Sequence, residues 1–204
     1  MKGCTRCWQQ EELDLLDGDP ELLSDKIVHK FAWESTDHFD RDEYELAWRR
    51  LGYRVVRVLE QDPDDKLTAG LKWARFDSWP EDEQTALRTL VTDVVVRAAG
   101  DPERRWKLDE LLQAAAQLDQ DIAPWLRLAD TFEDDAVAVL ADTYADLYVY
   151  SAGPMSWMMW DDSNQPIHDW LLSPALRARL STIDSPDAQD AVKNIDLMIE
   201  FSIR

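Results

Sequence analysis

Apolar residues recur along this chain at intervals of three and four, which is the spacing of one face of an α-helix. Five segments show the pattern clearly: 44–59, 87–98, 108–118, 137–147 and 188–199. In the last of them, Ala188, Val192, Ile195 and Ile199 fall on one face. Glycine is scarce, at 6 residues, and no Asn-Gly or Asp-Gly turn separates two alternating runs. The sequence therefore predicts an all-α fold.

Helix start signals agree with this periodicity. An Asp or Ser precedes a proline at residues 19–20, 62–63, 101–102, 173–174 and 185–186. A capping oxygen followed by proline favours the first turn of a helix. Ser78-Trp79-Pro80-Glu81 has the form of a capping box. These signals predict about eight or nine helices.

Residues 48–56 and 87–95 share one apolar pattern, as expected of a two-helix repeat. A HEAT-like helical repeat and an irregular helical bundle both remain open, since any two amphipathic helices look alike. A chain of 204 residues, 45% of them hydrophobic, can bury one core. We expect a single helical domain at 20–204, preceded by an N-terminal segment, 1–19, that could fray. No apolar run is long enough to span a membrane and no signal-peptide pattern is present, so we expect a cytoplasmic protein without a membrane partner.

Acidic residues dominate the charge. Asp and Glu number 42 against 22 Lys and Arg, which gives a net charge of -20. Between residues 108 and 176 there are thirteen acids and a single base, Arg127. This charge repels phosphate backbones, so nucleic acid is not an expected partner. Two interpretations remain open: a solvated face, and a docking face for a basic protein partner.

Residues 155–160 contain three Met and two Trp, next to this acidic stretch. They form either a buried plug between helices or an exposed contact patch, since Met and Trp are frequent at interfaces. For the docking interpretation, the candidate partner-binding residues are Asp130, Glu133, Asp134, Asp135, Asp142, Asp146, Trp157, Trp160, Asp161 and Asp162.

Cys4 and Cys7 form a Cys-x-x-Cys pair at the N-terminus. A closed zinc site needs two further ligands, and His29, His38 and His168 stand at no ligand-like spacing. We therefore expect two free thiols, with no metal and no cofactor. The sequence contains no P-loop, nucleophile elbow or dinucleotide fingerprint, so no catalytic residue is predicted.

A set of short elements runs through the first half of the chain: Leu23-Ser24-Asp25-Lys26, Trp33, His38-Phe39-Asp40, Leu71-Lys72-Trp73-Ala74 and Ser78-Trp79-Pro80-Glu81-Asp82-Glu83-Gln84. With the N-terminal cysteine segment, they resemble an uncharacterised bacterial family of small Trp-rich helical proteins that carry a Trp-Pro-x-x-Glu-Gln element. The resemblance implies helices and a bacterial origin. It implies no activity and no catalytic residue, and it leaves the acidic second half unexplained.

The sequence favours a non-enzymatic acidic protein-binding module, such as an inhibitor or immunity-type protein for a basic nuclease or toxin. Electrostatic steering would bring the partner in, and aromatic side chains near Trp157 and Trp160 would anchor it. Two alternatives stay open. One is an enzyme or small-molecule binder with a Trp-lined pocket and carboxylates, and the other is a helical-repeat scaffold.

Overall fold

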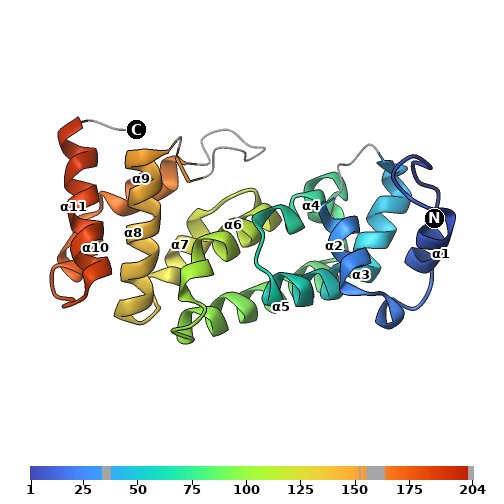
Figure 1. The fold of residues 1–204 in the computed structure, drawn as a ribbon, viewed down its shortest axis with the longest axis horizontal. Helices are drawn as coiled ribbons and strands as arrows, with labels where there is room; N and C mark the ends of the chain where they lie inside the picture. The colour runs from blue at the N-terminus through green and yellow to red at the C-terminus, as the bar shows by residue number, and fades with distance from the viewer. Residues whose placement is uncertain (34–37, 152, 155–163, 202–204) are drawn as a thin grey trace. The chain divides into compact units, whose positions relative to one another are not determined.

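The structure, a computed structural model, describes residues 1–33, 38–151, 153–154 and 164–201. These residues form eleven α-helices, and their only β pairing is a single bridge between Gly3 and Phe39 (Figure 1). The all-α prediction is confirmed. There are more helices than expected because some are very short: α4 (Gly70–Trp73) has four residues, too few to show a period. The choice between repeat and bundle, and the domain limits 20–204, stay predictions.

The chain divides into two compact units. Unit 1 comprises Met1–Val94 and Ala114–Gln120, and unit 2 comprises Val95–Gln113 and Asp121–Arg204. Unit 1 holds α1 (Gln10–Asp17), η1 (Pro20–Leu22), α2 (Asp25–Trp33), α3 (Arg41–Gln61), η3 (Asp65–Thr68), α4, η4 (Phe76–Ser78), most of α5 (Glu81–Gly100) and the end of α6 (Leu108–Asp119). Unit 2 holds the remainder of α5 and α6, with η5 (Arg105–Lys107), α7 (Ala123–Ala129), α8 (Asp134–Tyr150), α9 (Gln165–Leu171), α10 (Pro174–Leu180) and α11 (Pro186–Phe201).

An aromatic cluster lies in unit 1, where α2 packs against α3. The ring of Phe31 lies 5.3 Å from Tyr44 and 5.6 Å from Trp48, and Phe39 stacks on Tyr44 at 5.7 Å. Trp8 contacts Phe39 at 5.5 Å and is 2% exposed. The N-terminal segment 1–19 thus contributes a large side chain to this core, and such rings bury much apolar area each.

Arg54 is a buried cation within unit 1. Its guanidinium donates to the carbonyls of Pro20 and Leu23, at 2.6 and 2.9 Å, and to the carboxylate of Asp25 at 2.9 Å. It therefore fixes η1 and the start of α2 against α3. The two terminal nitrogens of the guanidinium are thus bonded, which offsets the cost of burying the charge, while its Nε is buried without a hydrogen-bond partner.

Helices α8 and α11 lie side by side in unit 2 (Figure 1). The buried face of α8 includes Leu140 and Tyr144, in agreement with the predicted stripe. On α11 the buried face is Ala188, Ala191, Ile195 and Met198, together with Asn194. The predicted placement of Ile199 on this face is wrong, since it is 53% exposed. The stripe continues through Met198 instead, one position earlier along the helix.

Helix starts match the Asp-Pro and Ser-Pro signals only in part. Ser173 and Ser185 accept hydrogen bonds from the backbone N–H groups of the first turns of α10 and α11. Asp19 caps the short turn η1. No α-helix begins directly after Asp62-Pro63 or Asp101-Pro102. Asp101 instead accepts the N–H of the residue two positions on, which closes a local turn.

The predicted capping box at Ser78 is wrong. The Ser78 hydroxyl donates to the carbonyl of Arg75 at 2.8 Å, and α5 begins only at Glu81. The capping box that the structure does contain lies at the start of α1, between Gln9 and Glu12. None of the helices in the described ranges is both long enough and apolar enough to cross a bilayer.

Candidate functional site

The four predicted partner-binding acids around the start of α8 contact basic or polar groups of the chain itself. Glu133 and Asp135 lie 3.2 and 3.3 Å from the guanidinium of Arg105, and Asp134 lies 2.8 Å from that of Arg179. The carboxylate of Asp130 accepts the indole N–H of Trp170 at 2.8 Å. Arg105 and Arg179 lie outside the short stretch that looked almost purely acidic in sequence, so the charge around the start of α8 is partly neutralised.

Asp142 and Asp146, further along α8, have a different environment. Asp187 and Asp190 of α11 act on the same site, because burial and the charges of Asp190, Asp187 and Asp146 together raise the pKa of Asp142 to about 6. A hydrogen bond at 3.5 Å from the Asn194 amide opposes the rise. We call Asp142, Asp146, Asp187 and Asp190 the α8–α11 carboxylate face.

Within the described ranges, none of these four carboxylates lies within ion-pair distance of a Lys or Arg. The α11 pair that does form, Arg177 with Asp196 at 2.7 Å, uses a different Asp. At Asp142, burial is the largest cause of the raised pKa, and the like charges of Asp190, Asp187 and Asp146 add to it. The face therefore favours a cation supplied from outside the chain.

Exposed apolar side chains occur on the same two helices. Tyr150 on α8 is 66% exposed, and Ile199 and Phe201 on α11 are 53% and 65% exposed. The other predicted site residues, Trp157, Trp160, Asp161 and Asp162, lie outside the residues that the structure describes.

Most described Trp side chains are buried, as the pattern predicted, but three are exposed and lie against a cation. Lys66 lies 5.0 Å from the ring centroid of Trp33, Arg41 lies 4.8 Å from that of Trp73, and Lys107 lies 4.6 Å from that of Trp106. Each ring is thus partly covered from within the chain.

A Trp-lined hollow of about 580 Å³ lies between α7 and α9 in unit 2. Trp170 lines it together with Asp130 and Asp169. Asp130 is already bonded to the Trp170 indole, and Asp169 accepts from the Gln165 amide at 2.7 Å. These polar side chains therefore bond within the lining itself, while Arg127 adds a cationic group to the same hollow.

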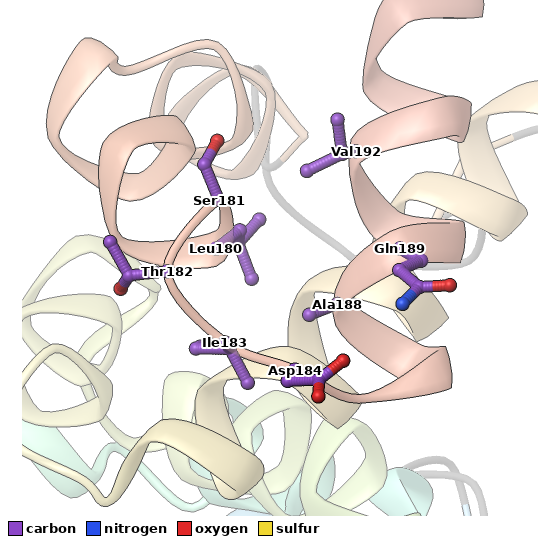
Figure 2. A pocket seen from close by; sticks show the side chains of 8 residues that line it. All are labelled: Leu180, Ser181, Thr182, Ile183, Asp184, Ala188, Gln189 and Val192. Carbon is purple, nitrogen blue, oxygen red and sulfur yellow. The ribbon is translucent and has the colours of Figure 1, made fainter.

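A second hollow, of about 440 Å³, lies between the end of α10 and α11 (Figure 2). Figure 2 shows Leu180 and Val192 on opposite sides of it, with Asp184 and Gln189 among its polar side chains. Asp184 is its single titratable side chain. The hydroxyls of Ser181 and Thr182, which also line it, donate to the backbone carbonyls of Arg177 and Arg179.

One cluster in unit 1 has the donor atoms of a metal site: Cys4, Cys7 and His38. Its His38 side chain bonds the Cys4 thiol, and with the backbone N–H groups of Arg6 and Cys7 it lowers the pKa of Cys4 to about 7. The sequence alone does not bring these three residues together, because their separation follows no ligand spacing.

Comparison of the chain with protein-family models, with curated proteins and with solved structures gives no match. The resemblance to a bacterial Trp-rich family therefore stays an expectation, and the site is interpreted from its own geometry.

Proposed function

We infer that this chain is a non-enzymatic binding module whose α8–α11 carboxylate face engages a basic protein. An inhibitor or immunity-type protein for a basic nuclease or toxin is the role that we propose. The observation that carries this inference is the convergence of four Asp side chains from α8 and α11, with no Lys or Arg of the described chain within ion-pair distance; burial, and after it the charges of the three other Asp side chains, raises the pKa of Asp142. A Lys or Arg of a partner would relieve that repulsion.

Attachment then needs apolar anchors near the charges. Tyr150, Ile199 and Phe201 supply exposed apolar area on α8 and α11. Trp157 and Trp160 stay predicted anchors. An interface built in this way associates fast at low salt, and its affinity falls as ions screen the carboxylates.

The proposal is tested by capture of basic proteins at low ionic strength on three immobilised chains: wild type, Asp142→Asn/Asp190→Asn, and the control Glu81→Gln/Asp82→Asn. The control removes two exposed charges from the first turn of α5. We expect a basic protein to bind wild type and control alike and to bind the first variant about tenfold more weakly. Binding should also weaken as the pH falls below about 6, where Asp142 gains its proton.

Two results would contradict the proposal. If the wild type captured no basic protein at low salt, the proposed basic partner would be contradicted. An equal loss in both variants would show that binding follows net charge and not the α8–α11 carboxylate face.

A further inference from the structure

The N-terminal Cys-x-x-Cys pair is shaped as a turn. The backbone N–H groups of Cys7 and Trp8 both donate to the carbonyl of Cys4, each at 3.0 Å. This turn brings the two sulfur atoms to the same side of the chain. In zinc sites, such a turn is the usual way for neighbouring cysteines to share one ion.

His38 reaches the turn through backbone pairing. Its carbonyl accepts the N–H of Cys4 at 2.8 Å, and Gly3 and Phe39 form a β-bridge beside it. The segment before α3 therefore returns to the N-terminus at a fixed register, so that the position of His38 depends on the fold and not on its distance along the sequence.

The core holds both sides of this arrangement in place. Trp8, directly after Cys7, is buried against Phe39, directly after His38, with 5.5 Å between the ring centroids. A side chain at Gly3 would collide with Leu13 and Phe39. The donors are therefore carried on packed backbone, which favours a preorganised site.

The donor atoms of Cys4, Cys7 and His38 all lie within 4.8 Å of one another. In a tetrahedral zinc site, bond lengths of about 2.0–2.3 Å place neighbouring ligand atoms roughly 3.5–3.8 Å apart. Side-chain rotations that close the cluster by about 1 Å would thus bring the three donors to ligand spacing.

We propose that Cys4, Cys7 and His38 bind a zinc ion, with water as the fourth ligand. Two thiolates and an imidazole are a donor set that zinc prefers over the hard cations magnesium and calcium. The ion would link the N-terminal turn to the segment that leads into α3, and one exchangeable position would remain open to solvent.

Cobalt is the probe, because Co²⁺ occupies zinc sites and reports thiolate ligation by its colour. The full chain, kept reduced, is titrated with Co²⁺. We expect one ion per chain, a sulfur-to-cobalt charge-transfer band, visible bands of tetrahedral geometry, and displacement of all of them by Zn²⁺. His38→Ala and Cys7→Ser should each weaken binding at least about 100-fold, since even indirect partners of a metal ligand account for 10–100-fold.

His29→Ala is the matched control. His29 lies on α2, and its ring stacks on that of Trp33 with 6.3 Å between the centroids. This contact does not involve the cysteines, so the loss of His29 should leave Co²⁺ binding unchanged. A second readout is thermal unfolding: a chelator should lower the Tm of zinc-loaded wild type and leave the Tm of His38→Ala unchanged.

Absence of the charge-transfer band in the reduced wild type would overturn the proposal. Equal Co²⁺ affinity of His38→Ala and wild type would also overturn it, because the cysteines alone would then account for binding. Cys7 is exposed, so the Cys7→Ser chain should fold. A loss of Co²⁺ binding in this variant would then reflect the missing thiolate and not unfolding. Neither outcome bears on the α8–α11 carboxylate face, which belongs to unit 2.

Discussion

Single residues in unit 1 are constrained by close approach of backbone to large rings. A Cβ atom on Gly70 would overlap the Tyr44 hydroxyl and lie 3.0 Å from the indole nitrogen of Trp48. Both rings are fully buried and belong to the aromatic cluster, so neither can move away freely. Gly70→Ala should therefore lower the free energy of unfolding by about 1–3 kcal/mol, as measured by urea denaturation.

Gly100→Ala is the control for this prediction, since nothing lies within 4 Å of the added Cβ. It should leave stability unchanged or raise it by up to about 1 kcal/mol, because alanine favours helix over glycine. If both substitutions had the same effect, packing against Tyr44 would not be the cause.

Arg54 is a second residue whose role depends on burial. Arg54→Met keeps the apolar contacts of the side-chain stem but leaves the carbonyls of Pro20 and Leu23 without their donors. We expect a loss of about 3 kcal/mol in unfolding free energy. Arg57→Met, which removes an exposed pair with Glu21 at 3.4 Å, should lose less than about 1 kcal/mol. Similar losses for the two variants would contradict a special role for Arg54.

At the scale of helices, the sequence predicted most of what local periodicity can specify. The stripe of α6 is fully buried from Leu108 to Leu118, as expected. Leu90, which falls on the apolar face predicted for residues 87–98, is 41% exposed, so its predicted place on the buried side of α5 is wrong. Periodicity fixes which residues share a face, but neighbouring helices decide how wide the buried face is. On α11 that choice favours Met198 over Ile199.

The pairing of α8 with α11 has a measurable dependence on pH. Asp142 has a pKa of about 6 in the folded chain and an ordinary value near 3.9 when unfolded. A raised pKa means that the folded state binds the proton more tightly, so Asp142 favours folding below pH 4 and loses this contribution as the pH rises through 6. Asp142→Asn mimics the protonated form and should therefore stabilise the chain at high pH.

We expect Asp142→Asn to raise the unfolding free energy by about 1 kcal/mol at pH 8, a value reduced from the full shift because the side chain is partly solvated. The gain should shrink as the pH falls from 6 to 4. Asp109, whose pKa burial also raises to about 6, titrates in both proteins and cancels in the difference. Denaturant curves at several pH values measure this, and a gain that is constant with pH would contradict the assignment.

At the scale of the whole molecule, sequence could not predict which charges meet. Arg49 donates two hydrogen bonds of 2.6 Å to Glu83, and Arg75 forms ion pairs with Asp42 and Glu45. In each pair, the two residues are about 30 positions apart in the sequence. The same limit hid the Cys4, Cys7 and His38 cluster. Counting charge along a segment therefore overstated the acidity around the start of α8 and left the α8–α11 carboxylate face unrecognised, since half of it lies on α11.

The net charge of -20 leads to opposite effects of salt on the free chain and on its proposed complex. Raising ionic strength from about 0.01 M to about 1 M shortens the Debye length from roughly 30 Å to 3 Å. In the free chain, screening weakens repulsion among 42 acids more than it weakens the internal ion pairs, which are exposed and individually weak. We expect a gain of about 1 kcal/mol, or roughly 2–4 °C in Tm by calorimetry. A Tm that fell with salt would mean that the ion pairs outweigh the repulsion. The excess negative charge, on which the steering of a partner depends, would then produce no net repulsion within the folded chain.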